Sequence, residues 1–152
     1  MSRILAIDPG YERSAWIRIG DGPTDFGIDP NENVVRGLRA GFLAADLVVI
    51  EKVEGYGMPV GVEVFETVRW AGRFEEACHP VPVERLGRKA IKIALCGSTK
   101  AKDPNIRQAL IDRYGGKDRA IGRKASPGPL YGISADVWAA LAVAVAWADG
   151  AR

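Results

Sequence analysis

Three acidic residues occupy positions where an ionised side chain is hard to stabilise. Asp8 ends the apolar run RILAID, Glu51 follows the apolar run LVVI, and Asp136 opens an otherwise almost uncharged stretch, VWAALAVAVAWA. A carboxylate beside a hydrophobic core requires an ionic partner, a proton or a metal ion. Because Mg²⁺ and Mn²⁺ prefer hard oxygen ligands, we predict that these three acids are both the metal ligands and the catalytic residues of one site.

Two such ions about 4 Å apart activate water on one side of a phosphodiester and stabilise the leaving oxygen on the other. We therefore expect two Mg²⁺ or Mn²⁺ ions in the site and hydrolysis of a phosphodiester bond. Each acid taken alone is equally well explained as a strand end or a helix cap at the surface. The hydrolytic interpretation therefore requires Asp8, Glu51 and Asp136 to meet in a single pocket.

The distribution of charge favours a polyanionic partner. Residues 1–84 carry 8 Lys and Arg against 14 Asp and Glu, whereas residues 85–124 carry 12 against 3. The alternative is a set of solvated helix faces, which is the usual origin of a charge run. The cations that we expect to contact a DNA backbone are Arg88, Lys89, Lys92, Lys100, Lys102, Arg123 and Lys124.

Tyr56 lies in the glycine-rich segment that follows Glu51. An aromatic ring there is suited to stacking on an unpaired base, so Tyr56 is a candidate DNA contact. A tyrosine that only fills a turn is the alternative. The glycine-rich segment lacks the GxxxxGKS/T pattern that binds a nucleotide.

The hydrophobic pattern predicts an α/β fold that begins with an antiparallel meander. The predicted strands are residues 3–8, 14–19, 24–28, 47–50 and 79–83. The predicted helices are residues 31–43, a stretch containing Val64, Val68 and Ala71, residues 87–95, residues 104–114 capped by Asp103, and residues 135–148 capped by Ser134. The Gly-, Lys- and Pro-rich residues 115–132 are predicted to form a mobile loop.

Length and composition indicate one domain spanning residues 1–152. No segment has the roughly 20 apolar residues that cross a bilayer, and the N-terminus does not resemble a signal peptide. Cys78 and Cys96 lack the spacing of metal ligands, which leaves them as buried thiols. We expect a cytoplasmic protein without a membrane partner.

Four segments resemble RuvC-type Holliday-junction resolvases of the RNase H-like superfamily. They are IDPGYERSAW, VVIEKVEGYG, RKAIKIALCGSTKAKDPNIRQALIDRYG and SADVWAALAVAVAW, in that order along the chain. The similarity covers most of the sequence and is closest to the compact resolvases of bacteriophages. A phage-encoded protein of this family would act in the cytoplasm of its bacterial host.

The resemblance implies an RNase H-like fold, with a five-stranded mixed sheet whose first three strands are antiparallel and with helices on both faces. It also implies a homodimeric crossover junction endodeoxyribonuclease that resolves four-way junctions by paired symmetric nicks. Asp8, Glu51 and Asp136 match the family's metal-binding acids, and Lys92 matches a basic residue of its DNA-facing helix. The helix containing Val64 and Val68 corresponds to a dimer helix.

One position departs from the family pattern. Many of these proteins have a second acid one helical turn after the residue that matches Asp136, where this sequence has Ala139. Glu54 is a possible substitute, although an exposed loop glutamate is the simpler interpretation. Two other functions therefore stay open: a nuclease for flaps, forks or structured RNA, and a nucleic-acid-binding module without catalysis.

Overall fold

The computed structural model describes residues 2–152, and its sheet begins with three antiparallel strands. These strands are β1 (Ile4–Asp8), β2 (Arg13–Ile19) and β3 (Pro23–Pro30). Two further strands, β4 (Leu47–Glu51) and β5 (Val83–Leu86), run parallel to β1 on its other side. The strand order is β3-β2-β1-β4-β5, which confirms the predicted five-stranded mixed sheet with its antiparallel strands first.

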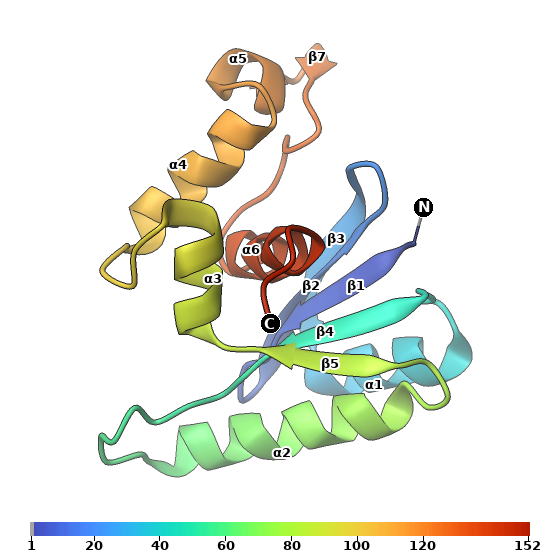
Figure 1. The fold of residues 1–152 in the computed structure, drawn as a ribbon. Coiled ribbons are helices and arrows are strands. Elements are labelled where there is room, and N and C mark those ends of the chain that lie inside the picture. Colours follow the sequence, from blue (N-terminus) through green and yellow to red (C-terminus); the bar gives the residue numbers. More distant parts are fainter. Residues whose placement is uncertain (1) are drawn as a thin grey trace.

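Helices cover both faces of this sheet, as predicted (Figure 1). One face packs against α1 (Asn31–Ala40) and α2 (Val62–Ala77). The other face packs against α6 (Val137–Ala148), with α3 (Arg88–Cys96) and α4 (Asp103–Arg113) outside α6. In Figure 1, α6 lies directly over the strands, and α3 and α4 stand beside it.

Helix α6 is the centre of the larger hydrophobic core. It contacts β1, β2 and β4 as well as α3 and α4, and its residues from Ala140 to Ala146 are all buried. Its alanines let the helix axis approach the sheet closely, while Leu141 fills the space between them without any exposed surface. A helix that is apolar on all sides is expected when every side has a neighbour.

Residues 115–132 differ from the predicted loop because they contain regular structure. They form a short helix, α5 (Lys117–Ala120), and a hairpin of β6 (Gly122–Arg123) and β7 (Ser126–Pro127). Leu130 anchors the end of this segment in the core, and its backbone N–H donates to the carbonyl of Ala120 at 2.7 Å. These contacts come from tertiary packing, which local composition does not reveal.

Smaller differences concern element boundaries. The predicted strand at residues 79–83 begins only at Val83, after a turn closed by a hydrogen bond from Val81 N–H to the Cys78 carbonyl. Asp103 is the first residue of α4 and not its N-cap, which is Lys102. Among residues 2–152, no helix has the length and apolar composition needed to cross a bilayer.

We predict that Leu141→Ala destabilises the protein by about 2–5 kcal/mol, because it leaves a cavity between α6 and the sheet. Urea unfolding measures this change. Ile93→Ala is the control, since the Ile93 side chain is 54% exposed and its truncation removes few contacts. Equal losses for the two variants would contradict the central position of α6.

Candidate active site

Asp8 and Glu51 lie side by side at one edge of the sheet. Their strands are parallel neighbours in the register Ile7 to Ile50, so the next residue of each strand reaches the same edge. Side chains alternate between faces along a strand, and Ala6 and Val49, two residues earlier, both belong to the core on the α6 side. Both carboxylates therefore face α6.

Asp136 reaches the same place from the start of α6. It is the N-cap residue of a helix that begins at Val137, so the prediction that Ser134 caps this helix was wrong. The Asp136 carboxylate makes no capping hydrogen bond. Ala135 immediately before it has a left-handed backbone with φ of 48°, which costs about 1–2 kcal/mol in a residue with a Cβ. This strained turn directs the chain into α6 at the edge where β1 and β4 end.

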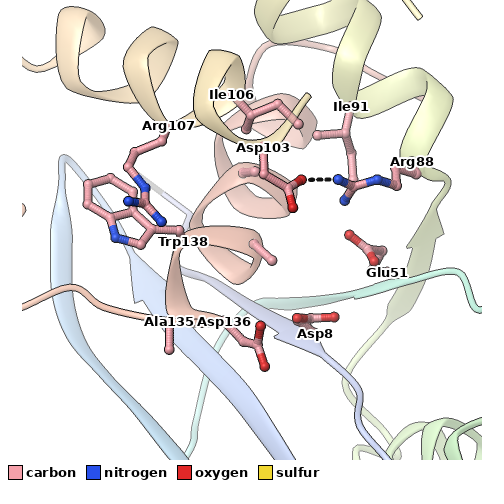
Figure 2. Close-up of a pocket in the computed structure, with 12 residues that line it drawn as sticks. Asp8, Glu51, Arg88, Ile91, Asp103, Ile106, Arg107, Ala135, Asp136 and Trp138 are labelled. Carbon is pink, nitrogen blue, oxygen red and sulfur yellow. Dashed lines mark hydrogen bonds and ion pairs between the residues drawn. The ribbon is translucent and has the colours of Figure 1, made fainter. Parts of the chain in front are cut away.

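The three acids line one cavity of about 390 Å³ (Figure 2). The structure thus brings together the residues that the sequence separates by 43 and 85 positions. The other residues that line this cavity are Arg88, Ile91, Asp103, Ile106, Arg107, Ala135, Trp138, Ala139 and Ala142.

Burial and the charges of neighbouring acids raise the pKa values of the two strand-end acids. The pKa of Asp8 rises to about 8, first because of burial and then because of the charges of Glu51 and Asp136. Burial raises the pKa of Glu51 to about 6, although the nearby Arg88 charge opposes the rise. Within residues 2–152, no hydrogen bond or salt bridge reaches these carboxylates from another side chain. The site therefore gathers carboxyl groups that no direct contact with another side chain stabilises in their ionised form.

Three helices begin at this cavity, and each contributes the residue at its N-terminus. Arg88 is the first residue of α3, Asp103 is the first of α4, and Asp136 caps α6. The N-terminus of a helix carries a partial positive charge and unpaired N–H groups. The cavity therefore combines carboxylates with a local field that favours anions such as phosphate.

A buried polar network fixes the turn that follows Asp8. The Ser14 hydroxyl accepts a hydrogen bond from the Gly10 N–H at 3.0 Å and donates one to Asn31 Oδ1 at 2.6 Å. The Asn31 amide donates in turn to the Gly10 carbonyl at 2.9 Å. A Cβ at Gly10 would lie 2.2 Å from the Arg13 carbonyl oxygen, so only glycine fits this turn. Sequence reasoning missed this support, because Ser14 and Asn31 lie in different elements.

The chemistry of the donor set fits a divalent metal ion, but the present side-chain positions do not form a complete ligand cage. Among residues 2–152, no three acidic, histidine or cysteine side chains are arranged to hold one ion. Repulsion keeps unpartnered carboxylates apart, and a bound cation would reverse this force. Ligation by Asp8, Glu51 and Asp136 together therefore requires these side chains to move closer to one another.

The predicted DNA contacts occupy three places. Arg88 lines the cavity itself. Lys89 and Lys92 lie on α3, and Lys100 and Lys102 lie in the turn between α3 and α4. Arg123 and Lys124 are exposed on the β6–β7 hairpin. This hairpin follows the far end of α4, an 11-residue helix about 16 Å long, so the structure does not bring these two residues to the cavity.

Tyr56 lies beside the acids, in the loop between β4 and α2. Its side chain is 52% exposed, and it lines a smaller hollow of about 180 Å³ together with Asp8, Glu51 and Arg88. Glu54 lines this smaller hollow too, but it is not among the residues that line the 390 Å³ cavity. The position that lacks the second family acid, Ala139, does line the large cavity.

Sequence reasoning missed three polar or aromatic residues of the cavity: Asp103, Arg107 and Trp138. Asp103 was interpreted as a helix cap, whereas its carboxylate accepts a hydrogen bond from the Arg88 guanidinium. The Arg107 guanidinium lies 5.3 Å from the centre of the Trp138 ring. A helical spacing of four between Asp103 and Arg107 was the available signal, since it places both on one side of α4.

Comparison with known proteins bears on the fold. No protein-family model and no curated protein matches the chain. Among solved structures, RuvC of Thermus thermophilus is similar over 97% of this chain and 93% of its own, with 18% identity and a TM-score of 0.69. The same protein in complex with a Holliday junction substrate matches over the same shares, with 19% identity and a TM-score of 0.71. The RNase H-like fold of RuvC, predicted from the sequence, is therefore confirmed for this chain.

Proposed function

We propose that this protein is a metal-dependent endonuclease that resolves four-way DNA junctions. The observation that carries the proposal is the convergence of Asp8, Glu51 and Asp136 in one cavity, without side-chain partners among the described residues and with raised pKa values for two of them. Strongly perturbed pKa values cluster at functional sites, so such groups in a cleft are candidates for functional residues. Their arrangement on a RuvC fold supports nuclease chemistry over a purely structural role.

In this proposal Asp8, Glu51 and Asp136 hold two Mg²⁺ or Mn²⁺ ions. The ions, when bound, supply an activated water and stabilise the charge on the leaving oxygen. Asp8, Glu51 and Asp136 would hold the ions beside the scissile phosphate, and the N-termini of α3, α4 and α6 attract that phosphate. In the hydrolysis, the water oxygen bonds to phosphorus and gives up a proton. The bond from phosphorus to the leaving sugar oxygen breaks with its electron pair, and that oxygen takes up a proton.

The substrate is proposed from charge and from the structural neighbour. Residues 85–124 contain 12 Lys and Arg but only three Asp and Glu, and this excess of positive charge favours a nucleic acid as partner. The neighbouring RuvC structure was solved with a Holliday junction substrate. We therefore propose a four-way junction as substrate, with Lys89, Lys92, Lys100, Lys102, Arg123 and Lys124 as phosphate contacts and with Tyr56 stacking on a base at the junction centre.

An exposed apolar surface on α2 supports a homodimer. Val62, Phe65 and Val68 are 78%, 64% and 49% exposed, and Met58 in the preceding loop is 71% exposed. Contiguous apolar side chains of this size usually mark an interface. Val64, which the sequence suggested for this role, is half-buried, so Val62 and Phe65 are better candidates beside Val68. A two-fold dimer presents two active sites to the two opposed strands of a junction.

The phage origin and the cytoplasmic location stay predictions.

We predict that Asp8→Asn abolishes Mg²⁺-dependent cleavage of a mobile four-way junction while junction binding persists. The variant removes one metal ligand and leaves the exposed cations unchanged. A gel assay of nicked strands measures cleavage, and fluorescence anisotropy in chelator measures binding. Flaps, forks and RNA hybrids are included as substrates, and single nicks on flaps would favour the broader nuclease function.

The control is Asp21→Asn, because Asp21 is an exposed acid in the turn between β2 and β3, outside the residues that line the cavity. It should cut at the wild-type rate. Normal cleavage by Asp8→Asn would show that the site is assigned incorrectly. Junction binding by the wild type without cleavage of any substrate would favour the non-catalytic binding module.

We predict that metal-free protein loses stability as the pH rises from about 4 to about 8. The folded-state pKa of Asp8 is raised from 3.8 to about 8, so folding favours the protonated acid, and this contribution disappears as the pH passes the folded value. Asp8→Asn removes the effect. Thermal unfolding in chelator should therefore show the variant increasingly more stable than the wild type from about pH 5 to about pH 8.

Saturating Mg²⁺ should remove most of this gap at about pH 8, since the wild type then gains stability from a ligand that binds only its folded state. A gap between variant and wild type that is independent of pH would contradict the raised pKa of Asp8. No effect of Mg²⁺ or Mn²⁺ on wild-type unfolding would contradict the metal site.

We predict that Phe65→Glu converts a dimer into a monomer that nicks junction strands singly. In a two-fold dimer the same surface of both subunits meets at the interface. A glutamate on the exposed α2 surface would therefore place two like charges near each other and would be desolvated there. Analytical ultracentrifugation measures the mass, and a supercoiled cruciform distinguishes paired from single nicks. Phe42→Glu is the matched control, because Phe42 is 77% exposed and lies outside α2. An unchanged mass for Phe65→Glu would exclude this surface as the interface.

A further inference from the structure

Arg88 differs from the other cations of the basic segment because it lies within the acidic cavity. It lines both the large cavity and the smaller hollow beside Tyr56. Its charge acts on Asp8 and on Glu51, whose pKa values it lowers against the effect of burial. Arg107, the other cation that lines the cavity, lies against the Trp138 ring instead. Arg88 is therefore the cavity cation that is electrostatically coupled to the proposed metal ligands.

The position of Arg88 is unfavourable unless it is compensated. It is the first residue of α3, and a cation at a helix N-terminus is repelled by the helix dipole. Compensation comes from Asp103, the first residue of α4, with which Arg88 forms a salt bridge. Figure 2 shows the guanidinium directed at Asp103, while Glu51 and Asp8 lie nearer to the strands of the sheet. The two helix ends thus hold one guanidinium above the carboxylates.

The salt bridge leaves donor capacity for a ligand. A guanidinium has five N–H donors in a planar fork, and the structure shows Asp103 accepting from one terminal nitrogen, Nη2. The Arg88 side chain is 32% exposed and Asp103 is 78% exposed, so the pair is open to a ligand that enters the cavity. Bidentate recognition of phosphate oxygens is the interaction for which this fork is suited.

We propose that Arg88 is a catalytic residue that binds a non-bridging oxygen of the scissile phosphate, and that Asp103 is a positioning residue that orients its guanidinium. This inference rests on the proposed nuclease function. Negative charge grows on the phosphoryl oxygens as the water oxygen approaches, and a fixed cation stabilises that charge more than it stabilises the ground state. Arg88 therefore contributes to the rate of the cleavage step, whereas the lysines outside the cavity contribute to affinity.

Asp103 has a second possible role that the experiment must separate. It lies in the same cavity as the three acids, and its charge contributes to the raised pKa of Asp8 and Glu51. If Asp103 is a fourth metal ligand through its other carboxylate oxygen, its loss weakens the affinity for a metal ion. If Asp103 orients Arg88 instead, its loss leaves the affinity for a metal ion unchanged. Calorimetric titration of the protein with Mn²⁺ alone distinguishes the two roles without any cleavage.

The test compares Arg88→Ala, Arg88→Lys and Asp103→Asn with the wild type under single-turnover conditions. Arg88→Ala should slow cleavage by about 100- to 1,000-fold, the usual effect of removing one donor to a developing negative charge. Its junction affinity in chelator should fall by less than about tenfold, as expected for one partly exposed charge contact. Arg88→Lys should recover only part of the rate, because an ammonium lacks the fork. Guanidinium ion added to Arg88→Ala should restore part of it.

Asp103→Asn should slow cleavage by up to about 100-fold through misplacement of the guanidinium, with Mn²⁺ affinity equal to that of the wild type. Arg113→Ala is the matched control, because it breaks a salt bridge of 2.6 Å between Arg113 and Asp149 at the other end of α4. This control should cut at the wild-type rate.

Three results would overturn the inference while the nuclease function stands. They are a loss of junction affinity as large as the loss of rate in Arg88→Ala, an unchanged rate in that variant, and weakened Mn²⁺ binding in Asp103→Asn. Failure of the nuclease proposal has a different signature, since the wild-type protein would then cut no branched DNA. Arg88 would in that case have no catalytic role to fill.

Discussion

The central physical constraint in this protein is the confinement of three carboxylates to one edge of a largely buried sheet. Parallel pairing of β1 and β4 places Asp8 beside Glu51, and α6 brings Asp136 against them. Desolvation and repulsion make this arrangement unfavourable when the acids are ionised, as the raised pKa values of Asp8 and Glu51 record. Proteins retain such an arrangement where a cation or a reaction compensates for it.

The rest of the fold stabilises this unfavourable cluster. The apolar helix α6 packs over β1, β2 and β4, while the network of Gly10, Ser14 and Asn31 fixes the turn after Asp8. The left-handed Ala135 adds local strain next to Asp136, and such strain persists only where surrounding packing determines the backbone. Elements that are far apart in the sequence therefore hold the backbone around the cavity, and metal binding requires only the acidic side chains to move.

The sequence predicted those features that depend on local pattern. Apolar runs that end in an acid identified β1 and β4 together with the two acids at their ends, which the structure brings to one cavity, and the alternation of residues 14–19 identified β2. Features that depend on distant contacts were missed. The order of residues 115–132 depends on the burial of Leu130, and the role of Asp103 depends on Arg88, which is 15 positions away. The start of α6 was misplaced because nothing in the sequence around Ala135 indicates a positive φ.

The most direct test of the account is the anomalous diffraction signal of Mn²⁺ in crystals of the wild-type protein. The account predicts one or two anomalous peaks within ligand distance of the carboxylates of residues 8, 51 and 136, with these side chains drawn together around them. Contradiction would come from Mn²⁺-saturated crystals in which this cavity has no anomalous peak and the three carboxylates remain apart.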